Sequence, residues 1–183
     1  MDKGTEYYRQ FLKGDGEVFS KILDLYRDKL IFFINRTVNN LSVAEEIAAD
    51  AFSELLFNPG RYNFKVSLKT YIFARAHHKM VSYIRRNSRF TMVSLEDVTP
   101  KSLEYAEFEE ELFREERKRI CHEALYKLPK DYRTVLHLLY FENMTYEEAA
   151  KVMKKNRKQV DNLLYRAKKA LRIILGEDGE LLL

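Results

Sequence analysis

Apolar side chains recur every three or four residues along most of this 183-residue chain, and this spacing constrains its fold more than any other feature. Residues at such spacing share one face of an α-helix. The pattern is clearest between residues 19 and 37, where the face consists of Phe19, Ile22, Tyr26, Leu30, Phe33 and Thr37. Only six glycines and three prolines interrupt the chain, which favours long helices over short strands. The sequence therefore predicts an all-α protein.

Helix breakers and caps divide the first half of the chain. A short first helix is expected to end at residues 14–16, Gly-Asp-Gly. Ser42 and Glu45 have the spacing of a capping box, which predicts that another helix begins at Ser42. Ser67 is expected to cap a third long helix. Antiparallel packing of these helices predicts a compact bundle.

Helical periodicity lapses in the middle of the chain, where Thr99-Pro100 favours extended or turn structure. We therefore expect two helical domains joined by a flexible linker. The predicted boundaries are residues 1–87 for the first domain, 88–102 for the linker, 103–176 for the second domain and 177–183 for a tail.

The most informative pattern lies between residues 145 and 171. Thr145 and Glu148 form a capping box that starts a short helix, and Asn156 and Gln159 do the same for the next helix. Only three residues separate the two helices. Residues 151–172 contain nine lysines and arginines against one acid, which creates a local positive field. Together these features predict a helix-turn-helix that binds DNA.

An α-helix fits the major groove, where side chains of its first turns can reach base edges. The residues predicted to contact bases or their surroundings are Arg157, Lys158, Gln159, Asp161 and Asn162. The residues predicted to contact phosphates, which fix position without reading sequence, are Lys154, Lys155, Arg166, Lys168 and Lys169. The alternative interpretation is a helical hairpin with a solvated basic face, because charge alone does not identify a ligand.

Several segments of the chain resemble bacterial sigma factors of the extracytoplasmic-function type. LPKDYR at residues 128–133 and FENMTYEEAAKVMKKNRKQVDNLLYRAKKAL at 141–171 are similar to region 4 of that family. AEEIAADAFSEL from Ala44 is similar to region 2.2, and SLKTYIFARAHHKMVSYIRR from Ser67 to regions 2.3 and 2.4. The resemblance spans nearly the whole chain in the family's order. It implies a transcription initiation factor that supplies promoter specificity and strand opening, while core RNA polymerase supplies all catalysis.

The resemblance also implies which surface meets which partner. Region 4 would read the −35 element of double-stranded promoter DNA and contact the polymerase β flap. The residues implied in binding the β′ clamp helices are Glu45, Glu46, Ala49, Asp50, Ser53 and Glu54. The residues implied in melting and reading the −10 element are Arg61, Tyr62, Phe64, Lys65, Lys69, Tyr71, Arg75, His78, Lys79, Ser82, Arg85 and Arg86. Tyr62 and Phe64 precede the long helix, so we expect them to be exposed and to stack on unpaired bases.

The chain departs from the family's usual residues at several positions. Tyr71, His78 and Ser82 stand where the family usually has Trp, Asn and Asp, and Ala49 stands where it often has Gln. Lys154 replaces the usual turn glycine, so a left-handed backbone there would cost strain that glycine avoids. The match to the family is therefore closer in the −35 region than in the −10 region.

Other chemistry has little support in the sequence. His77-His78 and Cys121-His122 are adjacent pairs on expected helices. Because neighbours on a helix point about 100° apart, neither pair can share a metal ion well. No phosphate-cradling glycine loop, nucleophile elbow or HExxH motif occurs. We expect no metal, no cofactor and no enzymatic activity.

The composition of the chain indicates in which cellular compartment it works. Cys121 is the one cysteine, which excludes a disulfide scaffold and favours a reducing environment. The chain has no run of about 18 apolar residues, and its amino end lacks the pattern of a signal peptide. We expect a cytoplasmic protein without membrane insertion, and the resemblance adds an anti-sigma factor as a further partner.

Two alternatives have different consequences. A helix-turn-helix regulator would bind DNA, usually as a dimer on a palindrome, without binding polymerase. A helical interaction module would show little affinity for DNA, and that affinity would lack the steep salt dependence of phosphate contacts.

Overall fold

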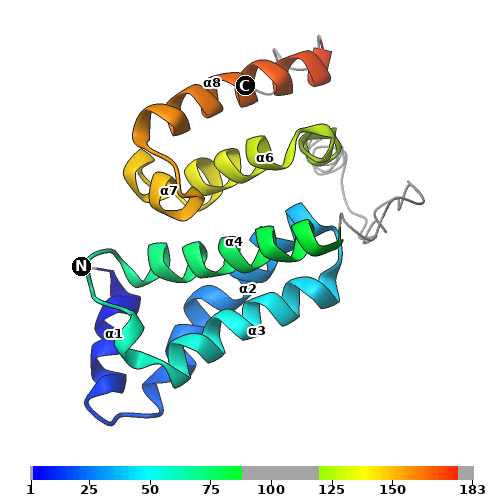
Figure 1. Ribbon diagram of the computed structural model, residues 1–183. Helices are drawn as coiled ribbons and strands as arrows, with labels where there is room; N and C mark the ends of the chain where they lie inside the picture. Colours follow the sequence, from blue (N-terminus) through cyan, green and yellow to red (C-terminus); the bar gives the residue numbers. More distant parts are fainter. Residues whose placement is uncertain (1, 88–119, 177–183) are drawn as a thin grey trace, which may run out of the picture.

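The computed structural model describes residues 2–87 and 120–176. Within these ranges all regular structure is helical, which confirms the predicted fold class (Figure 1). The first group comprises α1 (Lys3–Leu12), α2 (Val18–Val38), α3 (Leu41–Phe57), the 3-10 turn η1 (Pro59–Arg61) and α4 (Leu68–Asn87). The second group comprises a helical segment at 120–127, α6 (Lys130–Leu136), the π-helical turn η2 (His137–Phe141), α7 (Tyr146–Met153) and α8 (Arg157–Leu175). The predicted linker (88–102), the acidic start of the second domain and the tail lie outside the described residues.

The start of α3 differs from the prediction. The capping residue is Asn40, whose side-chain oxygen accepts a hydrogen bond from the Val43 amide at 3.1 Å. Asn39, one residue earlier, ends α2 in a left-handed conformation that asparagine tolerates better than most residues. The predicted capping box of Ser42 and Glu45 is therefore wrong, because both residues lie inside the helix, where α3 already begins at Leu41.

The caps predicted for the later helices are confirmed. The Ser67 hydroxyl accepts from the Thr70 amide at 3.1 Å at the start of α4. Both α7 and α8 begin with complete capping boxes. Lys154 ends α7 with φ 52° and ψ 44°, so a lysine holds the left-handed position where the resemblance expects glycine. Two flanking caps fix the geometry of this turn, which offsets the strain of a side chain there.

The first group is a bundle around aromatic and branched side chains. Tyr8, Ile22, Leu30, Phe33 and Phe73 are each at most 1% exposed. The Tyr8 hydroxyl donates to the Leu55 carbonyl at 2.9 Å, so its one polar atom is satisfied inside the core. Each such side chain contributes roughly 1.5–3 kcal/mol by leaving water.

The two groups pack against each other. In Figure 1, α7 lies between α4 below it and α8 above it, and the contacts of α7 with α4 are as extensive as those of α6 with α8. The end of α2 also meets α6. Buried side chains of both groups form one continuous cluster. The described parts of the chain therefore form a closed molecule in which the second group covers one side of α4.

Candidate nucleic-acid and polymerase interfaces

Helix α8 buries one side and presents the other to solvent. Its buried side chains are Val160, Leu164, Ala167, Leu171 and Leu175. The predicted base-contacting residues, at positions 157–159, 161 and 162, are all exposed. The Asn156 and Gln159 side chains each hydrogen-bond the other's backbone amide at 2.8 Å, so the first turn is held rigid. The structure thus gathers the predicted base readers on one open face at the beginning of a fixed helix.

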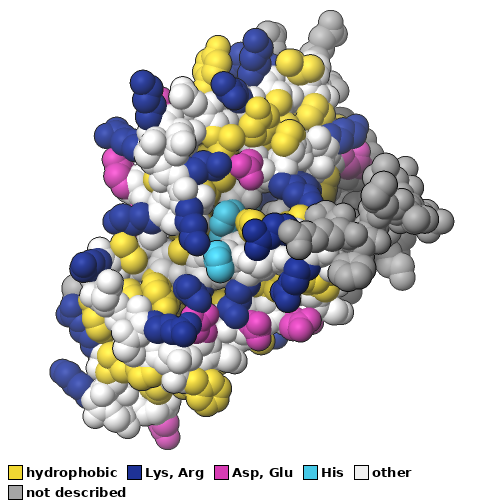
Figure 2. Space-filling model, in the orientation of Figure 1, with side chains coloured by type: hydrophobic (Ala, Val, Ile, Leu, Met, Phe, Trp, Pro, Cys, Tyr) yellow, Lys and Arg dark blue, Asp and Glu magenta, His cyan; other side chains and the backbone are white. Residues whose placement is uncertain are grey.

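Most of the predicted phosphate contacts are also open. Lys154, Arg166, Lys168 and Lys169 are exposed, and Lys155 is half-buried beside Asp131, with their charged atoms 3.2 Å apart. The Lys168 ammonium lies 5.3 Å from the centre of the Tyr140 ring, which draws this side chain towards η2. Figure 2 shows lysine and arginine side chains spread over this face of both groups. Both groups therefore contribute basic side chains to this face.

A groove of about 740 Å³ separates the exposed sides of α3 and α4. Glu54 of α3 lines the groove and contacts the guanidinium groups of Arg61 in η1 and Arg75 in α4. The Lys79 ammonium lies 3.3 Å from an Asp50 carboxylate oxygen in the same groove. Burial alone would raise the pKa of Glu54, but hydrogen bonds from the two arginines lower it below its usual range. Glu54 stays ionised and holds the predicted −10 cations in place.

The remaining predicted polymerase contacts form an open stripe along α3. Glu45, Glu46, Ala49, Asp50 and Ser53 are all exposed at spacings that share one helical face. Glu54, whose side chain is only 10% exposed, belongs instead to the ion pairs with α4. The structure brings five of the six residues together on a surface that a partner can reach.

The expected exposure of Tyr62 is wrong. Its side chain is 2% exposed and packs against the Tyr8 and Tyr71 rings. The Tyr62 hydroxyl donates to the Val66 carbonyl at 2.7 Å, so both its ring and its polar atom are satisfied internally. A loop position is not sufficient for exposure when the loop folds back over an aromatic core.

Phe64 is half-buried and has an unusual backbone. Its φ is 60°, which is rare for a bulky residue that is not glycine. The Tyr62 ring lies 4.6 Å from the Phe64 ring, and the Arg9 guanidinium lies 5.2 Å above it, measured to ring centres. Contacts on both sides therefore hold the ring in a strained loop.

The other predicted −10 residues divide between open and covered positions. Those exposed are Arg61, Lys65, His78, Arg85 and Arg86. Those half-buried are Lys69, Tyr71, Arg75, Lys79 and Ser82. Lys69 is covered by the second group: its ammonium lies 2.8 Å from a Glu142 carboxylate oxygen and donates to the Glu142 carbonyl at 2.6 Å.

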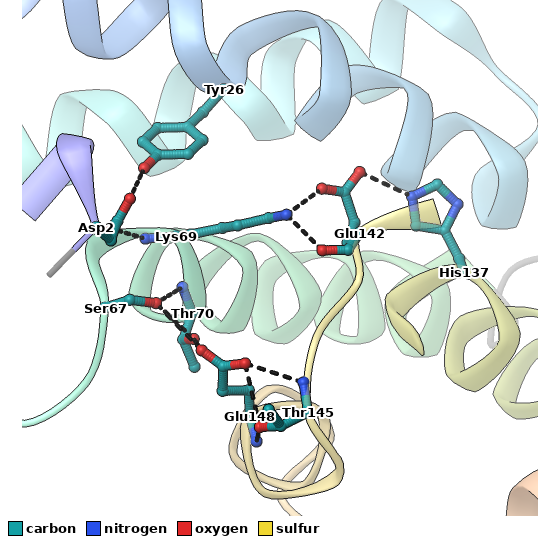
Figure 3. Close-up of polar contacts among 9 residues, drawn as sticks. All are labelled: Asp2, Tyr26, Ser67, Lys69, Thr70, His137, Glu142, Thr145 and Glu148. Carbon is teal, nitrogen blue, oxygen red and sulfur yellow. Dashed lines mark hydrogen bonds and ion pairs between the residues drawn. The ribbon is translucent and has the colours of Figure 1, made fainter. Parts of the chain in front are cut away.

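The contacts around Lys69 include residues that the sequence did not single out. Figure 3 shows Glu142 between Lys69 and His137, and Glu148 reaching from α7 to Ser67 and Thr70 of α4. Glu148 was predicted only as a helix cap, a role it also has. Its second carboxylate oxygen accepts from the Thr70 hydroxyl at 3.0 Å. Only the fold could reveal this contact, because 78 residues separate the partners.

Both acids in this contact are ionised. Burial alone would raise the pKa of Glu142, but His137 and Lys69 beside it lower the pKa below its usual range. The pKa of Glu148 is likewise lowered against burial, by the Thr145 amide and the Thr70 hydroxyl. Among the described residues no cluster of three histidine, cysteine or acidic side chains is placed to hold a metal. No helix in the same ranges is long and apolar enough to cross a membrane.

Comparison with known proteins matches both groups to one family. Residues 22–90 match sigma-70 region 2, and residues 118–171 match sigma-70 region 4. The sigma factor YlaC of Bacillus subtilis is 27% identical over 82% of this chain and 90% of its own length. The ECF sigma factor SigW of the same organism is 25% identical over 90% of this chain and 92% of its own.

The chain belongs to the extracytoplasmic-function sigma factors. Solved structures agree on the fold of this sigma factor. The sigma factor RpoE of Bartonella quintana, in complex with the anti-sigma factor NepR, is 20% identical with a TM-score of 0.71, over 87% of this chain and 98% of that one. CnrH, in complex with the cytosolic domain of CnrY, is 19% identical with a TM-score of 0.67, over 95% and 97% of the two chains. The match to region 2 covers most of α2 together with α3 and α4, and the match to region 4 covers the second group as far as Leu171 of α8.

Proposed function

We propose that this sigma factor reads the −35 element with the first turns of α8, reads and opens the −10 element with α4 and the loop before it, and binds core polymerase through the outer face of α3. The observation that carries this assignment is the open first turn of α8, where five polar side chains stand exposed on a capped helix behind a three-residue turn. This is the geometry with which helix-turn-helix proteins enter the major groove.

The assignment within α8 follows from the exposure and the chemistry of its side chains. Arg157 is 74% exposed and the acid that it pairs with, Glu147, is itself exposed, so the guanidinium can leave that pair for a base edge at little cost. Asn162 lies more than one turn further along α8, is exposed, and can pair with an adenine edge. The lysines of α8 flank this face and suit phosphates.

The −10 assignment depends on the groove between α3 and α4. Arg61, Arg75 and Lys79 are held along it by acids of α3, so cations that would follow a DNA strand are already ordered. Tyr71, half-buried against the Tyr62 ring and near Arg75, is the stacking surface proposed for unpaired bases, and Phe64 would stack on a base only after leaving its contact with Tyr62 or Arg9.

Polymerase binding is assigned to the exposed stripe of α3, facing the β′ clamp helices, with region 4 facing the β flap. We further propose domain boundaries at residues 1–87 and 103–176, action in the cytoplasm where the polymerase works, and no catalysis by the factor itself. Relatives of this fold are solved with anti-sigma factors, which supports an anti-sigma partner here as well.

Run-off transcription with purified chain, core polymerase and a genomic promoter library tests the proposal and identifies a promoter. Arg157→Ala combined with Asn162→Ala should then lower discrimination against a mutated −35 element, since each bidentate contact is worth about 1–3 kcal/mol. Gln159 is left intact because it caps α8. Lys29→Ala, which removes an exposed cation from α2, is the control. No stimulation of the core enzyme would refute the function, and unchanged discrimination would refute the role of α8.

A further inference from the structure

The end of α2 and helix α6 bring together two arginines that no acid accompanies. Arg36 is 6% exposed, and the Arg133 guanidinium donates to the Arg36 carbonyl at 3.0 Å, so the two residues lie close together. Burial lowers the pKa of Arg36, and the charge of Arg133 lowers it further. In the described parts of the chain, the groups that act on the pKa of either arginine include no carboxylate. Within these ranges the two positive charges therefore have no matching negative charge.

Several nitrogen atoms of these arginines lack an acceptor. Both terminal nitrogens of Arg36 and Nε of Arg133 are buried without a hydrogen-bond partner among the described residues. The Arg36 guanidinium lies 5.2 Å from the centre of the Phe32 ring and 4.7 Å from that of the Phe141 ring. Such rings attract the charge but do not satisfy the N–H donors, which lie in the plane of the guanidinium. Because unpaired donors of a buried charged group are costly, we expect an acceptor at this place.

A cavity of about 10 Å³ lies between the two arginines, and its wall consists of Arg36, Leu125, Arg133, Leu136, His137 and Phe141. This volume suits one particle of about the size of a water molecule. Apart from a nitrogen of His137, the side chains of the wall offer donors and no acceptor. A water molecule would find few acceptors for its own hydrogens there and would leave the charges unbalanced. A halide accepts from several donors and also neutralises one charge, so it fits the chemistry of the wall better.

We propose that the cavity between Arg36 and Arg133 is a binding site for one monatomic anion, with chloride as its occupant. Chloride would accept hydrogen bonds from the unpaired nitrogens of both arginines and so join the end of α2 to α6. Because both arginines must be in place to form the site, chloride would bind the folded chain and stabilise it. None of the residues that line the cavity is among those predicted to bind DNA or polymerase, so the site does not depend on the proposed function.

The test measures binding of chloride to the purified full chain by chloride NMR, in which the line broadens when the ion exchanges into a protein site. A chloride series gives the dissociation constant. Bromide should narrow the line by competition, whereas glutamate, which is too large for the cavity, should not at the same concentration. Arg36→Met removes the charged donors from the cavity and should weaken chloride binding about tenfold. Lys29→Met and Lys130→Met, which remove one exposed cation each from α2 and α6, are the controls and should leave the dissociation constant unchanged.

A second variant and the wild type guard against a loss of folding. Arg133→Met should weaken chloride binding in the same direction as Arg36→Met, and circular dichroism shows whether each variant keeps its helices. Should neither variant fold, the competition of bromide against glutamate in the wild type still decides. Equal dissociation constants in the wild type and in folded Arg36→Met, or equal narrowing by bromide and glutamate, would mean an adventitious ion on the basic surface only and would overturn the site. A wild type that does not broaden the line would overturn it as well.

Discussion

The two helices proposed to face DNA begin differently. Helix α8 is capped by its own neighbours, Asn156 and Gln159, and its first turn is open to solvent. Helix α4 has the local cap Ser67 and two remote ones as well: its first amides donate to the Thr5 hydroxyl at 2.9 Å and to the Asp2 carboxylate at 3.4 Å. The carboxylates of Glu142 and Glu148 then contact Lys69 and Thr70 in the first turn of α4.

This difference teaches that the two readers are prepared to different degrees. The proposed −35 reader, α8, is built from local sequence and its first turn is exposed. The proposed −10 reader, α4, takes two of its caps from Asp2 and Thr5 and is partly covered by α7 and Glu142, so its geometry depends on the whole fold. Three measurements test this difference between α8 and α4: the salt dependence of DNA binding, the effect of cap substitutions on the free energy of unfolding, and the pH dependence of that free energy.

The largest effect should come from salt. If α8 and its turn neutralise about five phosphates, the log affinity for a −35 duplex falls with log salt at a slope of roughly −4 to −5. A fourfold rise in salt would then weaken binding roughly 250- to 1,000-fold. Fluorescence anisotropy over a salt series measures the slope, and Lys168→Ala with Lys169→Ala should make it shallower by about two units. A slope near zero would remove α8 from the DNA interface.

The caps should differ in cost. Thr5 is 4% exposed, and Thr5→Val would leave the Leu68 amide without its acceptor, which costs about 1–3 kcal/mol of the free energy of unfolding. Asn156→Ala removes the exposed local cap of α8 and should cost about 1 kcal/mol. Urea unfolding of both variants gives the comparison. A smaller loss for Thr5→Val than for Asn156→Ala would contradict the dependence of α4 on α1.

The smallest effect should be that of pH. Burial lowers the pKa of His77, on the inner side of α4, to about 4, whereas the unfolded chain titrates near the usual 6.5. Between these values the unfolded chain binds the extra proton, so the free energy of unfolding decreases as the pH falls from about 6.5 to 4. We expect a loss of about 1–2 kcal/mol between pH 6.5 and pH 5. Unfolding of wild type and His77→Gln at both pH values measures it; equal pH dependence in the two would contradict a neutral buried histidine.

Local patterns predicted much of this molecule. The helical class, the two capping boxes around Lys154 and the exposed face of α8 all follow from residues within a few positions of one another. The capping residue of α3 was predicted wrongly. Asn40 and Ser42 both suit that role, and the left-handed backbone at Asn39, which ends α2, favours Asn40.

The covered side of α4 could not be predicted in the same way. Tyr62 lies in a loop whose burial depends on Tyr8, 54 positions away, and Glu148 contacts Thr70 across the two regions. A residue that already serves one local role gives no signal of a second, distant one. Long-range contacts therefore account for both the error at Tyr62 and the missed acids.

The central claim is that this sigma factor selects promoters through the first turns of α8. Anisotropy of a −35 duplex with the polymerase-bound factor, for the wild type and for Arg157→Ala combined with Asn162→Ala, tests it directly. We predict that the wild type prefers this duplex to a base-substituted duplex, and that the variant loses about tenfold of that preference. An unchanged preference in the variant would contradict the account.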